Sequence, residues 1–132
     1  MKLAHSTSRS GRAHTYERQR RDRAATAVLR TQYPEFASLR LEYVFSDAGP
    51  FTPVPQATVM HPAARAYFVF PCPYSHCDGE FDLSAAIHAM AHADQSECEG
   101  ELQCSGHRMP DSATGKARCD LKLDYVVRAE RS

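Results

Sequence analysis

Four cysteines arranged as two pairs constrain the fold of this chain more than any other feature of its sequence. Cys72 and Cys77 lie in a short segment that also contains Pro73 and Gly79, and the second pair lies on either side of a turn-like stretch. Two such pairs, separated by a longer segment, supply the four ligands that a tetrahedral Zn²⁺ site requires. The pattern therefore predicts one zinc ion that joins two distant parts of the chain through Cys72, Cys77, Cys104 and Cys119.

The second pair fits this site if its two segments form an antiparallel hairpin. Fourteen residues separate Cys104 from Cys119, and with these cysteines directly opposed, Gly106 faces Ala117 and the loop covers residues 109–114, which are rich in turn formers. Directly opposed residues have Cα atoms about 4.5–5.5 Å apart, so both sulfurs would reach one ion. Both cysteines also share the apolar face of their predicted strands.

Three other interpretations of the cysteines remain open at this stage. The two pairs could form local disulfides, which an oxidising compartment would favour. His76 or His107 could replace one cysteine as a ligand. The four thiols could also be buried and unrelated to one another. Cys98 is a separate case: it lies between two glutamates, which raise the pKa of a thiol, so we expect it to be unreactive.

Length and composition restrict where such a chain works. With 132 residues, it suits a single domain. No apolar run approaches the roughly 18 residues of a membrane span, and the first residues contain no apolar signal region. We therefore expect a cytoplasmic protein with no membrane segment, in which reduced thiols favour metal binding over disulfides.

The charge is unevenly divided along the chain. Residues 1–30 carry a net charge of +6 and the remainder carries −6. Arginines clustered on a helix can follow phosphates, so nucleic acid is one expected partner; the candidate residues are Arg18, Arg20, Arg21 and Arg23. Alternatively, this segment is a solvated helix face, or it docks on an acidic surface of its own or of another chain. An acidic loop is expected at Glu97, Glu99 and Glu101.

Hydrophobic periodicity predicts an α+β fold. Residues 1–14 are expected to form a flexible basic arm, and residues 15–132 a single domain. One helix is predicted from near Thr15, its N-cap, to Gln32, and a second, inserted helix from Ser84, its cap, to about Gln95. Strands are expected at 39–45, 56–60, 65–70, 80–83, 101–108 and 118–128, forming an antiparallel sheet of about four or five strands.

The residues around the cysteines resemble a zinc ribbon over about residues 66–128. The matching motifs are Phe-x-Cys-Pro-x-x-x-Cys-x-Gly at 70–79, Cys-x-Gly at 104–106 and Cys-x-Leu-x-Leu-x-Tyr at 119–125. The first turn is longer than the commonest Cys-x-x-Cys, and a helix is inserted between the halves. The whole chain is similar to small uncharacterised bacterial proteins that carry Cys-Pro-Tyr-x-x-Cys-Asp-Gly-x-Phe-Asp-Leu. The resemblance implies binding to nucleic acid, to the transcription or translation machinery, or to partner proteins.

Catalysis is not expected, because four protein ligands leave no open position on the metal. His88 and His92 have metal-compatible helical spacing, but Ala89 stands where a zinc-protease motif has a glutamate. Glu80 and Asp82 alternate with apolar residues, as on the wet face of a strand. We therefore expect a zinc-binding regulatory or nucleic-acid-binding protein with no small-molecule substrate. The alternative is a protein-interaction adaptor or homodimer whose basic arm docks on an acidic surface.

Overall fold

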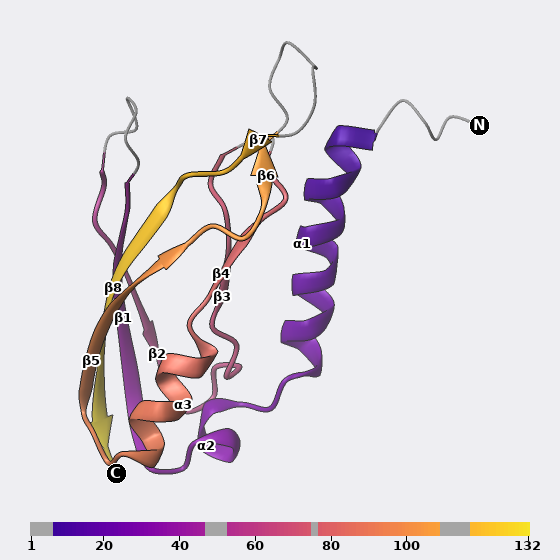
Figure 1. Ribbon diagram of the computed structural model, residues 1–132. Coiled ribbons are helices and arrows are strands. Elements are labelled where there is room, and N and C mark those ends of the chain that lie inside the picture. Colours follow the sequence, from indigo (N-terminus) through magenta and orange to yellow (C-terminus); the bar gives the residue numbers. More distant parts are fainter. Residues whose placement is uncertain (1–6, 47–52, 75–76, 109–116) are drawn as a thin grey trace.

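The computed structural model describes residues 7–46, 53–74, 77–108 and 117–132, and its main feature there is a four-stranded antiparallel sheet (Figure 1). The strand order is β2 (Gln56–Met60), β1 (Phe36–Ser46), β8 (Lys122–Arg131) and β5 (Glu97–Gln103). Two small antiparallel pairs accompany it: β3 (Val69–Pro71) with β4 (Glu80–Asp82), and β6 (His107–Arg108) with β7 (Ala117–Arg118). The helices are α1 (Thr7–Ala25), α2 (Leu29–Gln32) and α3 (Ser84–His92). The predicted α+β class is confirmed.

One face of the large sheet forms the core. Alternate residues of β1 and β8, such as Leu41 and Leu123, have no exposed surface, as expected for strands with one buried face. Phe81 of β4 and Ile87 and Met90 of α3 belong to the same buried cluster. The sheet, α3 and the β3–β4 pair therefore form one core, and Cys72, Cys77, Cys104 and Cys119 belong to the same buried cluster.

Helix α1 lies outside this core, beyond the β3–β4 pair as seen from the large sheet (Figure 1). It begins at Thr7 rather than near Thr15, so Thr15 lies inside the helix and is not its N-cap. Residues 7–14, predicted as part of the flexible arm, belong to α1; residues 1–6 lie outside the described residues.

The prediction of one continuous helix up to Gln32 is wrong, because the helical conformation is interrupted between α1 and α2. There the chain pairs with a distant segment: the Ala66 N–H donates to the Ala27 carbonyl at 2.9 Å, and the Leu29 N–H donates to the Ala64 carbonyl at 2.7 Å. This pairing uses backbone groups that a helix would need for itself. It also buries Leu29 completely, so tertiary contacts outweigh the local helical preference.

Two local predictions about α3 and β5 also need correction. Helix α3 ends at His92 rather than near Gln95, and Ser84 is its first residue rather than its cap. The Ser84 N–H donates to the Asp82 carboxylate at 2.8 Å. Strand β5 starts at Glu97, so the predicted acidic loop is an edge strand whose glutamates alternate with half-buried residues. Pairing with β8 satisfies backbone hydrogen bonds of this segment. The alternation of side chains leaves the glutamate carboxylates in water.

Candidate metal centre

The four predicted cysteines converge on one buried point, although they come from different parts of the fold. Cys72 follows β3, Cys77 precedes β4, Cys104 follows β5 and Cys119 follows β7. Each is at most 1% exposed, and the four sulfur atoms all lie within 4.8 Å of one another. The Sγ atoms of Cys77 and Cys104 are 3.5 Å apart, and those of Cys72 and Cys119 are 3.9 Å apart.

These distances suit a tetrahedral metal ion. Zn–S bonds of about 2.3 Å place neighbouring sulfurs slightly less than about 4 Å apart. All five cysteines are free thiols, so the disulfide interpretation does not hold, and the interpretation as unrelated thiols fails because the four sulfurs form one cluster. His76 and the side chain of His107 lie outside what the structure describes, so their role as replacement ligands stays untested.

Two similar turns form the centre of the site. In each, a cysteine is followed two residues later by a glycine whose N–H points at the sulfur: Gly79 N–H donates to Cys77 Sγ and Gly106 N–H to Cys104 Sγ, both at 3.4 Å. We call Cys77–Gly79 and Cys104–Gly106 the two knuckles. Such N–H groups stabilise a thiolate, because a hydrogen bond to the charged form favours it.

The knuckles pack against each other backbone to backbone. A Cβ added at Gly79 would lie 2.6 Å from the Gly106 nitrogen and would also overlap Cys104 Sγ. A Cβ added at Gly106 would overlap the backbone nitrogen and Cα of Gly79. Any side chain at either position would therefore push the two halves of the cluster apart, so this approach requires glycine on both sides.

The predicted hairpin register around the second pair is wrong by two residues. The Cys104 N–H donates to the Leu121 carbonyl at 2.9 Å, and the Cys119 N–H donates to the Gly106 carbonyl at 3.2 Å. Cys119 therefore lies beside Gly106 rather than opposite Cys104. Because side chains alternate with a period of two, a shift of two residues leaves both sulfurs on the predicted face. The predicted loop at 109–114 lies outside the described residues.

Without a cation, the cluster resists carrying more than one negative charge. The hydrogen bond from Cys72, helped by the Gly106 N–H, lowers the pKa of Cys104 to about 5. Burial raises the pKa of Cys77 to about 12 and also raises the pKa of Cys119. The same hydrogen bond to Cys104, followed by burial, raises the pKa of Cys72. Only a bound cation would stabilise four buried thiolates together.

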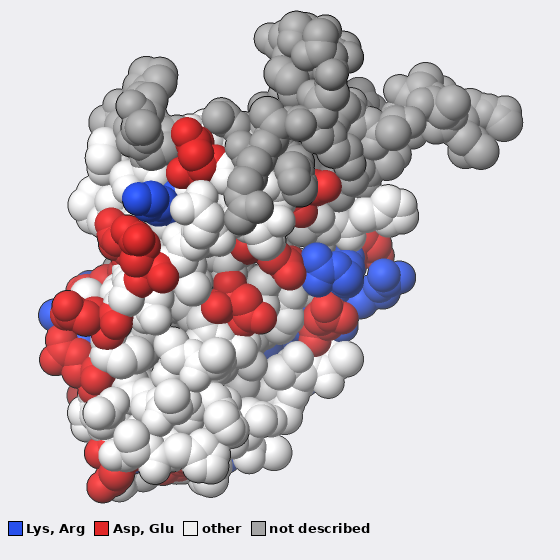
Figure 2. All heavy atoms as spheres, in the orientation of Figure 1, with Lys and Arg blue, Asp and Glu red and all other residues white. Residues whose placement is uncertain are grey.

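The four candidate nucleic-acid-binding arginines lie on α1 and differ in their contacts. Figure 2 shows basic side chains gathered at the right of the molecule, where α1 runs. Arg18 pairs with Glu80 at 2.8 Å, and Arg20 with Glu17 at 2.9 Å. The guanidinium of Arg23 lies 5.1 Å from the centre of the Tyr67 ring. Arg21 is exposed and forms no ion pair with any residue that the structure describes. Among the described contacts, Arg20 and Arg21 are therefore the two candidate arginines whose guanidinium groups do not pair with residues outside α1.

The other residues considered in the sequence have simpler roles. Cys98 lies in β5; burial and then Glu97 raise the pKa of its thiol. His88 and His92 have ring centres 4.3 Å apart on α3, but in the described part of the chain the cysteine cluster is the only close group of three or more metal-ligating side chains.

Sequence reasoning missed a set of contacts between α1 and the first knuckle. Thr15 and Gln19, four residues apart on α1, are its buried side chains over the described stretch 13–25. They bond to the Asp78 carbonyl and to the Glu80 carboxylate. The available signal was a pair of uncharged polar residues at helical spacing beside a strongly charged run.

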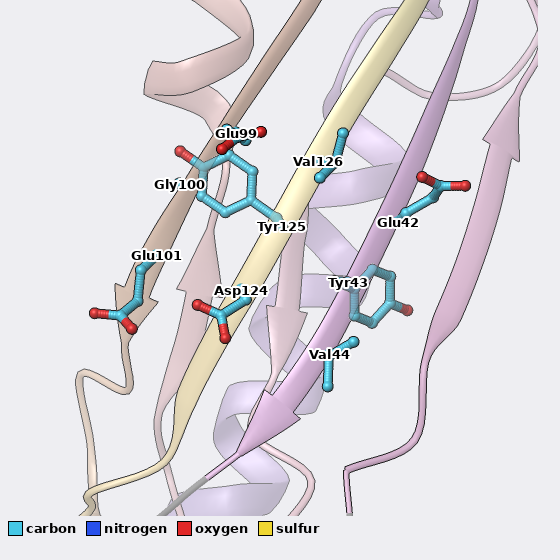
Figure 3. A pocket seen from close by; sticks show the side chains of 9 residues that line it. All are labelled: Glu42, Tyr43, Val44, Glu99, Gly100, Glu101, Asp124, Tyr125 and Val126. Atoms are coloured by element: carbon cyan, nitrogen blue, oxygen red, sulfur yellow. The ribbon is translucent and has the colours of Figure 1, made fainter.

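The outer face of the large sheet carries an acidic hollow of about 500 Å³ (Figure 3). Its apolar floor includes Val44 and Val126, and four carboxylates surround it: Glu42, Glu99, Glu101 and Asp124. Glu42 pairs with Arg40 and Arg128, and these hydrogen bonds, that of Arg40 first, lower its pKa. Glu101 lies directly opposite Asp124 in the register, an unfavourable juxtaposition of like charges.

Comparisons of the chain with models of known protein families, with curated proteins and with solved structures find no match. None of the helices in the described part of the chain has both the length and the apolar surface that crossing a bilayer demands. The candidate site is therefore interpreted from its own geometry.

Proposed function

We propose that this protein binds one structural Zn²⁺ ion through Cys72, Cys77, Cys104 and Cys119, in a zinc ribbon at about residues 66–128. The observation that carries this proposal is the convergence of four buried sulfurs, all within 4.8 Å of one another. A tetrahedral set of four thiolates favours zinc or iron over harder cations. In each of the two knuckles a glycine N–H points at the cysteine sulfur of that knuckle, which is consistent with the resemblance of the sequence to zinc ribbons.

The proposed role of the metal is structural rather than catalytic. Four protein ligands complete the tetrahedral shell and leave no position for water or substrate. Their burial also keeps solvent from the ion. We therefore propose no enzymatic activity, and a reducing compartment such as the cytoplasm, where the thiols stay available to the metal.

The proposed function is regulatory binding of nucleic acid through the exposed arginines of α1. Arg20 has a side chain that is 75% exposed, and Arg21 is also exposed. Exposed guanidinium groups on one helix can neutralise successive phosphates and release their counterions. The acidic sheet face would be repelled by phosphate, so α1 is the surface on which such a ligand would be bound.

Nucleic-acid binding is expected to be salt-sensitive and to depend on Arg20 and Arg21. Fluorescence anisotropy with labelled duplex DNA and single-stranded RNA, at several salt concentrations, measures this. Replacing both with glutamine should weaken binding about equally on all sequences and reduce the slope of log K against log salt by about one unit per lost phosphate contact. Arg18 and Arg23 are less suitable, because they also contact Glu80 and Tyr67.

The matched control is Arg128→Gln, which removes one arginine from the outer face of the sheet and should leave affinity unchanged. If neither nucleic acid bound at low salt, the proposal of nucleic-acid binding would be wrong.

The acidic hollow favours the second candidate, a protein-interaction adaptor or homodimer in which a basic segment docks on an acidic surface. Its carboxylates and apolar floor match the charged head and hydrocarbon stem of arginine. Under this alternative, light scattering should give a mass above that of the monomer at low salt, and the mass should fall as salt shortens the range of charge attraction. A monomeric mass that salt does not change would contradict self-association.

A further inference from the structure

Helix α1 is attached to the protein through polar contacts. Over the described side chains from Ala13 to Ala25, the buried ones are Thr15, at 6% exposure, and Gln19, at 2%. Both are polar, so this stretch contributes no fully buried apolar side chain to the core. A helix docked in this way gains little hydrophobic stabilisation, and its position depends on the partners of a few hydrogen bonds.

Those partners are Asp78 and Glu80, at the first knuckle, and we call these two residues the seat of α1. Thr15 Oγ1 donates to the Asp78 carbonyl at 3.0 Å. Gln19 Nε2 and Arg18 Nη2 both donate to Glu80 Oε1 at 2.8 Å. Asp78 lies between the ligand Cys77 and Gly79, and Glu80 is the next residue. The seat of the helix and the metal knuckle are therefore one continuous piece of chain.

The second knuckle supports the same seat. Ser105, between Cys104 and Gly106, bonds through its hydroxyl to both the N–H and the carbonyl of Glu80, each at 3.3 Å. The orientation of the Glu80 carboxylate thus depends on both knuckles. The knuckles in turn meet at the Gly79–Gly106 contact, and a metal ion bound by all four sulfurs would hold them together.

We propose that metal occupancy controls the docking of α1. This inference rests on the metal site of the proposed function and adds its regulation. With the ion bound, the knuckles hold Asp78 and Glu80 in place and α1 is docked. Without it, no ion joins the four sulfurs, the knuckles separate, and α1 leaves its seat. Release frees Arg18 from Glu80 and Arg23 from Tyr67, so it changes the positive surface that is available to nucleic acid.

Linkage makes the coupling reciprocal: if metal favours the docked helix, the docked helix must strengthen metal binding by the same factor. A double variant, Thr15→Val with Gln19→Leu, removes two of the hydrogen bonds to the seat and leaves every cysteine unchanged. It should therefore bind Zn²⁺ more weakly than the wild type, by about five- to 150-fold for two lost hydrogen bonds. Thr26→Val is the matched control, because Thr26 Oγ1 bonds within its own segment, to the Asp22 carbonyl.

Hydrogen–deuterium exchange with mass spectrometry tests docking directly on the full chain. The samples are the zinc-loaded protein, with loading verified by native mass spectrometry, the same protein after chelation, and the zinc-loaded double variant. Amides of α1 are expected to exchange about tenfold faster or more after chelation and in the double variant, whereas β1 and β8 stay protected. Competition with a chromophoric chelator gives the metal affinities of the wild type, the double variant and Thr26→Val.

Two outcomes would overturn the coupling while leaving the metal site intact: unchanged α1 exchange on removal of verified bound metal, or loss of protection in α1, β1 and β8 together, which would indicate global unfolding. Equal zinc affinity of the wild type and the double variant would also overturn it. A native mass spectrum with no bound metal is a different result, because it would remove the metal site of the proposed function and this inference with it.

Discussion

Cys104→Ser is expected to abolish stoichiometric metal binding and to lower the free energy of unfolding by about 3–5 kcal/mol. Structural zinc contributes about 10–16 kcal/mol in small zinc-finger peptides, which have almost no other core. This chain also has a large apolar core that includes Leu41, Leu123 and Ile87, so the sheet should survive and only part of that energy should be lost. The variant also leaves three buried sulfurs without a complete site.

Chemical denaturation gives the change in stability, and native mass spectrometry gives the metal content. The wild type is expected to carry one Zn²⁺ per chain; one iron instead would correct the identity of the metal. Cys98→Ser is the matched control, since Cys98 lies in β5, outside the cluster, and should keep both metal and stability. A Cys104→Ser protein with full metal content and unchanged stability would show that the cluster is not a metal site.

Gly79→Ala is expected to cost about 3 kcal/mol or more and to weaken metal binding strongly, although it adds only one methyl group. The new Cβ would meet the Gly106 backbone at 2.6 Å and overlap the sulfur of Cys104. Neither is the free end of a flexible side chain, so relief requires the two knuckles to move apart. Thermal or chemical denaturation and zinc competition measure the two effects.

Gly100→Ala is an informative control, because it makes the same chemical change in β5. Its Cβ would lie 2.5 Å from the Tyr125 hydroxyl, and Figure 3 shows the Tyr125 ring beside Gly100. The overlapping atoms, which include Tyr125 Cζ at 2.8 Å, are the far end of a half-buried side chain that can move away by rotation about χ1, so the cost should be about 1 kcal/mol or less. If Gly79→Ala proved as mild as Gly100→Ala, the close approach of the knuckles would not be essential for the site.

The sequence was most informative where chemistry depends on residue type alone. Few side chains bind soft metals, so four cysteines in two pairs were sufficient to predict the candidate ligands. Alternation predicted which side of the strands Cys104 and Cys119 occupy. It could not predict the register, because shifts by two residues keep the same face. The turn geometry that decides between such registers depends on backbone conformation rather than on the hydrophobic pattern.

Other features depended on contacts between distant segments. The break before Leu29 comes from pairing with residues 64–66, which no local pattern contains. The edge strand β5 carries Glu97, Glu99 and Glu101, an unusual composition for a strand, and it is fixed by pairing with β8. The seat of α1 joins Thr15 to Asp78 across the chain. Local propensity is a weak guide where such long-range pairs decide the conformation.

The position of β8 has a consequence for how this protein is made. β8 lies between β1 and β5 in the sheet, yet it is synthesised after both of them, and Cys119 is made shortly before it. Before that, β2 is the one partner of β1 among the described strands that has been made, and three of the four clustered cysteines are present without the fourth. Completion of this sheet and loading of the proposed ion should therefore occur together, after translation of β8, so a nascent chain stalled before Cys119 would have neither.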